Sequence, residues 1–157
     1  MKQFIQKVEP IPFTKDGFEK IQKEQEQLLV ERVDALTHLK KSREMGDLKE
    51  NGYYQASRQK MNAIDGRLRR IKFLLKYGVV LSPSQSGMVE IGSTVTLKTG
   101  NNEVTYQIVG GEESNPSEGR ISHRSPLGKA LFSHKTGEKI TLNLPAGSTD
   151  YLIKKIS

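Results

Sequence analysis

Two carboxylates three residues apart, Asp47 and Glu50, form the pattern with the clearest chemical potential in this chain of 157 residues. On one face of a helix, that spacing brings the two side chains within about 5–6 Å of each other. Mg²⁺ in proteins is commonly held by one or two carboxylates, with water or phosphate oxygens completing an octahedron. Two acids alone make a poor metal site, so they become useful only if another macromolecule supplies the remaining ligands.

The same two acids also have a structural interpretation. Asp-x-x-Glu at the start of a helix is the sequence of a capping box, in which each side chain binds a free backbone N–H group. Both acids are also favoured at the positive end of a helix dipole. The residue types alone leave both interpretations open.

An aromatic and a basic side chain follow the acids. Tyr54 and Arg58 lie one and two turns into the next predicted helix. An aromatic ring and a guanidinium group at these positions are able to stack on a base or to hold a phosphate. Tyr54 fits equally well as the first position of a helix–helix seam, and Arg58 as a solvated charge.

A pair of predicted helices must position these residues, one on each side of segment 46–51. In residues 14–45, apolar side chains recur at steps of three and four, with Thr14 as the predicted N-cap. Gly17 occupies the position at which a capping box would have Glu. The apolar positions of this pattern are Phe18, Ile21, Leu28, Leu29, Val33, Leu36 and Leu39.

The second helical pattern follows a heptad seam and ends at Gly78, a predicted C-cap. Each helix has roughly 25–30 residues and should be about 40 Å long at a rise of about 1.5 Å per residue. Only a few residues connect the two helices, so we expect antiparallel neighbours in a coiled-coil hairpin. The seam positions are Tyr54, Ser57, Met61, Ile64, Leu68, Ile71 and Leu75.

The second half of the chain has a different pattern. Segment 81–87 breaks the helical repeat and carries little charge, so it predicts a boundary between domains 1–80 and 81–157. Beyond it the apolar period is two, interrupted by one short helix with Ser125 as N-cap and Pro126 at its first position. We expect an α+β protein, in which an antiparallel sheet wraps around this helix. The predicted strands are 89–91, 94–97, 104–109, 140–144 and 151–153, with a turn at 100–102.

Composition limits the possible classes of protein. The net charge is +7, and residues 1–80 hold 17 Lys and Arg against 11 Asp and Glu, so the first half should approach any polyanion. The chain has no cysteine, which excludes disulfides and thiolate metal sites. No apolar run approaches the ~20 residues of a membrane span, and residues 1–5 are too short for a signal peptide. We expect a soluble cytoplasmic monomer.

The chain resembles the bacterial Gre transcript-cleavage factors over nearly all of its length. The resemblance rests on four separated motifs in the right order, which makes chance a poor explanation. The motifs are Pro12–Phe18, Gly46–Asn51 followed by Tyr54, Ala56 and Arg58, Ile91–Val95, and Ile121–Ser122 with Ser125–Leu131 and Gly137.

The resemblance implies a coiled-coil hairpin followed by an FKBP-like C-terminal domain. It implies that the C-terminal domain docks beside the secondary channel of RNA polymerase and that the hairpin reaches the active centre through this channel. There Asp47 and Glu50 would help to hold a Mg²⁺ ion shared with the polymerase, which then cleaves backtracked RNA near its 3′ end. The protein would bind no cofactor alone and would be no enzyme itself. A capping role for the two acids is compatible with this, because caps fix where acids point.

The resemblance also implies contacts for other residues. A basic patch on the hairpin would contact the nascent RNA 3′ segment, and such phosphate contacts predict salt-sensitive binding with little base preference. The same patch is equally explicable as an exposed helix face. The predicted RNA contacts are Tyr54, Arg58, Arg67 and Arg70, with Arg69 and Lys72 in the same patch. The predicted polymerase-docking residues are Ser125, Pro126, Leu127 and Gly128. The helix that contains them is equally explicable as one that only packs inside the sheet.

Two positions depart from the family pattern. Position 53 is Tyr where the family commonly has Glu, and position 52 is Gly where it commonly has Ala. These changes leave open a second hypothesis, a Gre-like regulator that occupies the channel without stimulating cleavage, although the retention of Asp47 and Glu50 argues against it. A coiled-coil nucleic-acid-binding module would explain the basic hairpin but not the two acids. Prolyl isomerisation is disfavoured, because the second half offers few aromatic residues for a pocket.

Overall fold

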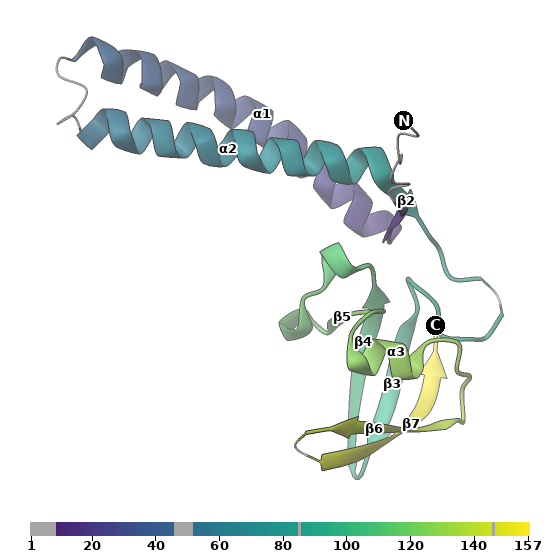
Figure 1. The fold of residues 1–157 in the computed structure, drawn as a ribbon. Helices are drawn as coiled ribbons and strands as arrows, with labels where there is room; N and C mark the ends of the chain where they lie inside the picture. Colours follow the sequence, from purple (N-terminus) through teal and green to yellow (C-terminus); the bar gives the residue numbers. More distant parts are fainter. Residues whose placement is uncertain (1–8, 46–51, 85, 146) are drawn as a thin grey trace, which may run out of the picture. The chain divides into compact units, whose positions relative to one another are not determined.

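The computed structural model describes residues 9–45, 52–84, 86–145 and 147–157 (Figure 1). By contacts, these residues form two compact units. One is the helical unit Phe18–Tyr77, and the other, the β unit, joins residues 9–17 to the described part of 78–157. The predicted boundary at 80/81 lies close to the end of the helical unit, but residues 9–17 group with the later part of the chain.

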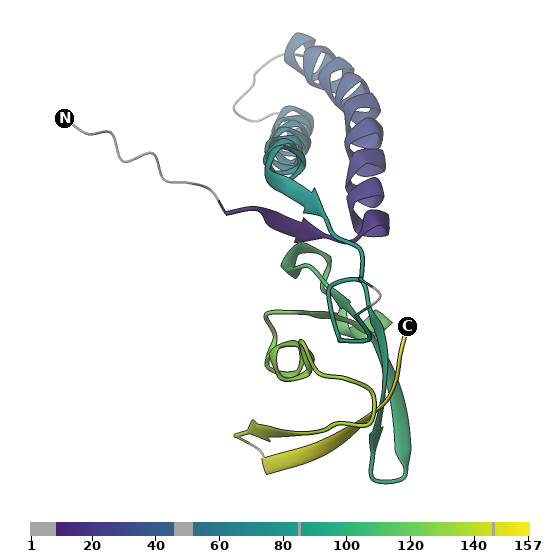
Figure 2. The ribbon, with the colours of Figure 1, turned by 90° about the vertical axis from the view of Figure 1, so that its right-hand side faces the viewer.

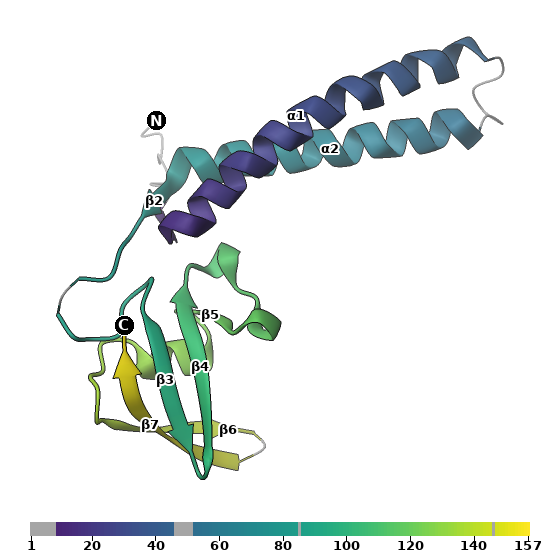
Figure 3. The same cartoon turned by 180° about the vertical axis from the view of Figure 1, so that it is seen from behind.

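The helical unit is built from two long helices. Helix α1 (Lys15–Glu44) contributes all but its first turn, and α2 (Gly52–Tyr77) contributes its whole length. The two helices run side by side in opposite directions (Figures 1 and 3). The predicted antiparallel hairpin is therefore confirmed. Its buried centre consists of Ala35, Leu39, Met61 and Ile64, flanked by the partly buried Leu28, Leu36, Tyr54 and Leu68.

Several predicted seam positions are wrong. Leu29 and Val33 are 51% and 65% exposed, whereas Ala35 is buried. The buried face of α1 follows a seven-residue repeat, which a helix in a coiled coil keeps toward its partner. Steps through Leu29 and Val33 drift away from that face. At the end of α2, Leu74 rather than Leu75 is fully buried.

A short parallel ribbon joins the two ends of the hairpin sequence. Strand β1 (Ile11–Phe13) pairs with β2 (Gly78–Val80), which follows α2 directly. The sequence patterns did not predict this pairing, because neither three-residue strand is long enough to show a period of two. Gly78 follows the last residue of α2, as predicted, and it is also the first residue of β2.

The larger sheet has the strand order β5-β4-β3-β7-β6. Pairs β3–β4, β3–β7 and β6–β7 are antiparallel, whereas β5 joins β4 in parallel. Figure 2 shows α3 (Pro126–Leu131) end-on inside the curve of this sheet. The strands are β3 (Thr94–Thr99), β4 (Asn102–Val109), β5 (Arg120–Ser122), β6 (Lys139–Leu144) and β7 (Gly147–Ile156). The core consists of Val89, Val95, Leu97, Ile108, Ile121, Leu131, Ile140 and Ile153.

The predicted fold class is confirmed, with two local corrections. The predicted strand 89–91 is not a strand, because Val89 exchanges backbone hydrogen bonds with Ser133 and His134 in an irregular segment. Strand β5 is additional, and it makes the sheet mixed rather than wholly antiparallel. The turn at Gly100 and the strands on either side of it are confirmed.

Candidate functional site

The segment that contains the two predicted metal-binding acids joins the helices of the hairpin. Helix α1 ends at Glu44 and α2 begins at Gly52. Asp47 and Glu50 themselves lie outside the described residues. Within the described ranges, no group of three or more His, Cys, Asp or Glu side chains could hold a metal ion.

The net positive charge of the two helices comes from one of them. Helix α2 carries seven Lys and Arg against one Asp, whereas α1 carries seven basic and seven acidic residues. Its net positive charge makes α2 the part of the hairpin that favours an anionic ligand.

Arg67, a predicted RNA contact, is engaged by α1. Its Nε and Nη2 donate hydrogen bonds to the two carboxylate oxygens of Glu24, at 2.6 and 2.7 Å. These bonds hold the pKa of the Glu24 carboxyl below its ordinary value of 4.5, against the opposing effect of partial burial. The fork geometry fixes the guanidinium beside its partner carboxylate and neutralises much of its field.

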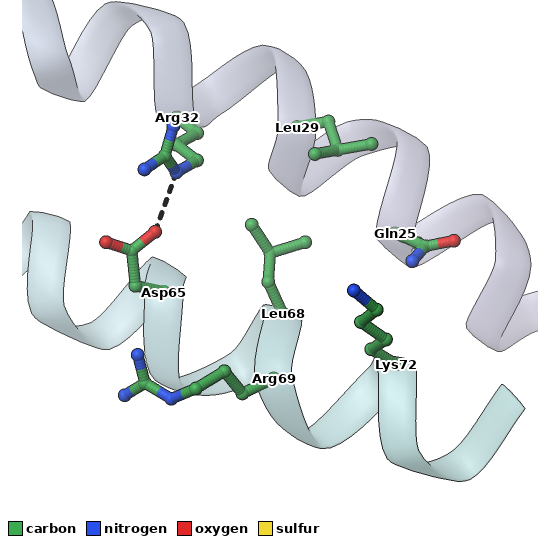
Figure 4. A pocket seen from close by; sticks show the side chains of 7 residues that line it. All are labelled: Gln25, Leu29, Arg32, Asp65, Leu68, Arg69 and Lys72. Carbon is green, nitrogen blue, oxygen red and sulfur yellow. Dashed lines mark hydrogen bonds and ion pairs between the residues drawn. The ribbon is translucent and has the colours of Figure 1, made fainter. Parts of the chain in front are cut away.

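A second ion pair joins the helices beside a groove. Arg32 on α1 donates from Nε to Asp65 on α2 at 2.7 Å. The groove beside this pair has a volume of about 490 Å³ and is lined by Leu29 of α1 and Leu68 of α2, of which Leu68 extends into the space between the helices (Figure 4). The amino group of Lys72 points toward Gln25, and Arg69 extends along α2 (Figure 4).

The other predicted RNA contacts have different environments. Tyr54 is half-buried in the seam, and the guanidinium carbon of Arg43 lies 6.0 Å from its ring centroid. Arg70 lies over the ring of Phe73 at 5.6 Å. Arg58 is exposed and makes no ion pair with another described residue. Of the three arginines predicted to contact RNA, Arg58 is therefore the one most accessible to a phosphate.

A small pocket on the hairpin was not predicted. It is lined by Ala35, His38, Tyr53, Ala56, Ser57 and Lys60. Nδ1 of His38 and the hydroxyl of Tyr53 form a hydrogen bond of 2.7 Å across the two helices. The residue numbers of this pair add up to the same total as those of Glu24 and Arg67, as expected for facing positions in an antiparallel hairpin. That register comes from the structure, so no signal in the sequence alone could have paired His38 with Tyr53.

The predicted docking residues lie at the start of α3. The hydroxyl of Ser125 accepts a hydrogen bond from the N–H of Gly128 at 3.0 Å, which confirms Ser125 as the N-cap. A Cβ at Gly128 would lie 2.0 Å from the carbonyl oxygen of Ser122, so this position requires glycine. Leu127 packs partly against the core, whereas Pro126 is exposed. Three of the four residues therefore have structural roles, and Pro126 offers the exposed surface.

No helix among the described residues has the length and apolar character that a membrane span requires.

Residues 11–80 match the family model described as "Transcription elongation factor, N-terminal", and residues 84–157 match "Transcription elongation factor, GreA/GreB, C-term".

Similar proteins carry the same description. "Transcription elongation factor GreA" of Nitratiruptor sp. is 39% identical over 92% of this chain and 91% of the relative. The protein of the same description from Dehalococcoides mccartyi is 36% identical over 96% and 99% of the two chains. The solved structure of GreA factor homolog 1 (Gfh1) of Thermus thermophilus is similar with 25% identity and a TM-score of 0.45, covering 94% of this chain and 99% of that one. The chain therefore belongs to the GreA/GreB family of transcription elongation factors.

Proposed function

We propose that this transcription elongation factor inserts its hairpin into the secondary channel of RNA polymerase and stimulates cleavage of backtracked RNA near the 3′ end. The observation that carries the proposal is the position of Asp47 and Glu50 in the connection between two long helices. With 30 and 26 residues, the helices are about 45 and 39 Å long, enough to reach through a protein channel.

The chemistry of the two acids fits a shared magnesium ion. Mg²⁺ prefers carboxylate oxygens and keeps several positions for water and phosphate, so an incomplete set of protein ligands is normal for it. Asp47 and Glu50 would add two carboxylates to a weakly held ion in the polymerase active centre. In two-metal hydrolysis, such an ion supplies an activated water opposite the ion that stabilises the leaving oxygen. The protein alone is therefore expected to cleave nothing.

The basic residues of α2 would hold the displaced RNA. Seven cations against one acid give this helix a field that attracts phosphates without reading bases. Arg58 is exposed and close in sequence to the acidic segment, so it is the predicted contact with the most direct access to a phosphate. Tyr54 would contribute from the seam between the helices. Arg67 would contribute from its position beside Glu24, and Arg70 from its position over Phe73.

The β unit would provide the docking surface on the polymerase. Pro126 is exposed at the start of α3, while Ser125 and Gly128 hold the first turn of that helix in place. A Pro126→Ala variant should weaken polymerase binding and leave the fold intact. Gly128→Ala should instead disturb the fold, because its Cβ has no space.

The test is a stalled, backtracked polymerase that carries end-labelled RNA, incubated with and without the protein. We expect release of short 3′ fragments in the presence of the protein and Mg²⁺, and none from the protein with free RNA. Binding to polymerase without any release would contradict the proposal.

A second candidate function has one observation in its favour. The residue at position 53 is Tyr, whose hydroxyl is hydrogen-bonded to Nδ1 of His38 at 2.7 Å. An acid at this position would add negative charge close in sequence to Asp47 and Glu50. A Gre-like regulator that occupies the channel without stimulating cleavage would tolerate this change. In the same assay it would block elongation and release no fragments, and Tyr53→Glu would then be expected to restore cleavage.

A further inference from the structure

The pocket beside Tyr53 has the size and lining of a site for a flat ring. Its volume is about 260 Å³, just below the ~300–1,000 Å³ of pockets for drug-sized ligands. It lies between α1 and α2 at the end of the hairpin where α2 begins, since Tyr53 is the second residue of that helix. A single ring system is the class of ligand that such a volume admits.

One wall of the pocket is an aromatic ring held in a fixed position. Tyr53 is 40% exposed, and its hydroxyl is hydrogen-bonded to Nδ1 of His38 at 2.7 Å. The two rings meet edge to face, with centroids 6.2 Å apart and planes at 84°. Because the partner on α1 restrains the ring, little conformational entropy remains to be lost when a ligand stacks on it.

The rest of the pocket combines small side chains with a positive charge. Ala35 and Ser57 are buried, and Ala56 adds a third small side chain, so these described residues leave space next to the ring. Lys60 is exposed at the pocket and makes no ion pair with any described residue. An apolar cleft with one aromatic wall and one cation fits a base that carries a phosphate.

We propose that this pocket accepts one unstacked nucleobase of single-stranded RNA, stacked against Tyr53, with Lys60 contacting the adjoining phosphate. This proposal rests on the proposed function, because the transcript is the single strand that would meet the hairpin near its acidic segment. Base–aromatic stacking tolerates any sequence, since every base has a π-face. The excess of six basic residues on α2 favours this anionic ligand over an acidic or neutral protein segment.

The test is a titration of the full-length protein with a single-stranded RNA pentamer, followed by NMR of the alanine methyl groups. We expect saturable shift changes at Ala35 and Ala56. A fully abasic pentamer of the same charge should bind at least about fivefold more weakly and leave those two methyls unshifted, because one base stack is worth about 1–3 kcal/mol. Equal binding of the intact and abasic pentamers would overturn the proposal, as would the absence of any shift at the two methyls.

Variants of Tyr53 distinguish the contribution of its ring to RNA binding from that of its hydroxyl. A control variant elsewhere detects general effects on RNA binding. Tyr53→Ala should lose about fivefold in affinity or more, and Tyr53→Phe should lose less, since it keeps the ring. The control is Phe132→Ala, which removes a ring of similar exposure (38%) in the β unit and should bind RNA normally. Normal RNA binding by Tyr53→Ala, together with loss of polymerase binding, would assign the pocket to a protein contact and overturn the proposal.

The two proposals fail in different experiments. Cleavage that depends on Asp47 and Glu50, combined with equal affinities for the intact and abasic RNA, would refute the base pocket alone. Methyl shifts in the pocket without any stimulated cleavage would refute the cleavage function and leave the RNA contact in place.

Discussion

The carboxylate of Glu113 accepts a hydrogen bond from the backbone N–H of Thr14 at 2.8 Å, although 99 positions separate the two residues in the chain. The Thr14 hydroxyl donates to the other carboxylate oxygen and accepts from the N–H of Gly17 at 3.1 Å. Thr14 is thus the N-cap of α1, and Glu113 does what the third helical residue does in an ordinary capping box. All three residues belong to the β unit.

This arrangement explains why the third helical position is glycine. A Cβ at Gly17 would lie 1.8 Å from Oε1 of Glu113. Glutamate at position 17, the usual capping-box choice, would therefore exclude the residue that performs the task. The acid that is missing from position 17 is supplied by Glu113, the last residue of the 3₁₀ helix η1 (Gly111–Glu113).

The first prediction is that Gly17→Ala destabilises the protein, which is the opposite of the usual effect of this substitution in a helix. Glycine to alanine within a helix normally stabilises a protein by about 0.5–1 kcal/mol. Here Gly17→Ala should lower the free energy of unfolding by about 1–3 kcal/mol, because the new methyl group collides with Glu113. In a Glu113→Ala background the same substitution should become neutral or stabilising. Urea denaturation of the four proteins measures both effects.

The matched control for this cycle is Gly66→Ala in α2. A Cβ at Gly66 would meet only a guanidinium nitrogen of Arg69, at 3.8 Å. It should stabilise the protein to the same extent whether or not Glu113 is present. Equal effects of Gly17→Ala in the two backgrounds would show that Glu113 is not the residue that requires glycine.

The second prediction concerns the ion pair between Glu24 and Arg67. Their side chains are 36% and 47% exposed, so solvent screening limits the coupling energy to about 0.5–1 kcal/mol. The pKa of Glu24 is lowered in the folded protein, so the stabilisation is complete above pH 4.5 and is lost as the pH falls through that lowered pKa. A double-mutant cycle with Glu24→Gln and Arg67→Ala should show coupling at pH 7 that is lost once the pH is below the lowered pKa of Glu24. Coupling that persists unchanged in acid would contradict the assignment.

The third prediction ranks the cations of α2 as RNA contacts. Arg58 has no described acidic partner, whereas Arg67 is held by Glu24, so Arg58→Ala should weaken RNA binding more than Arg67→Ala. Losing one phosphate contact to a single strand should reduce the slope of log affinity against log salt by about 0.7. Fluorescence anisotropy with labelled RNA at several salt concentrations measures the slope. Lys98→Ala, an exposed cation on β3, is the control and should leave it unchanged.

Local patterns predicted most of the fold. The heptad seam around Met61 and Ile64 and the Ser125 cap of α3 depend on residues close together in sequence, and both are confirmed. The pairing of β1 with β2 and the capping of Thr14 by Glu113 join residues far apart, and no periodicity marks them. Leu29 and Val33 were misplaced because a simple three-and-four step does not separate the seam from the neighbouring helix face.

The candidate site was predictable to a different extent. Asp47 and Glu50 were found by their types and spacing, and they lie outside the described residues, so their role stays a prediction. No motif in the sequence singled out His38, and its partner Tyr53 was noticed only as a departure from the family pattern. Their contact depends on the register of the hairpin, which becomes known only once facing residues on the two helices are paired.

The most direct test of the central claim compares Asp47→Asn and Glu50→Gln with the wild type in the cleavage assay, while affinity for the polymerase is measured separately. Each substitution keeps the shape of the side chain and removes the charge that binds Mg²⁺. Asp34→Asn removes the same charge from an exposed position of α1 and serves as the control. We expect Asp47→Asn and Glu50→Gln to bind polymerase normally and to cause no release of RNA fragments, whereas the control stimulates cleavage like the wild type. Normal cleavage with both Asp47→Asn and Glu50→Gln would contradict the account.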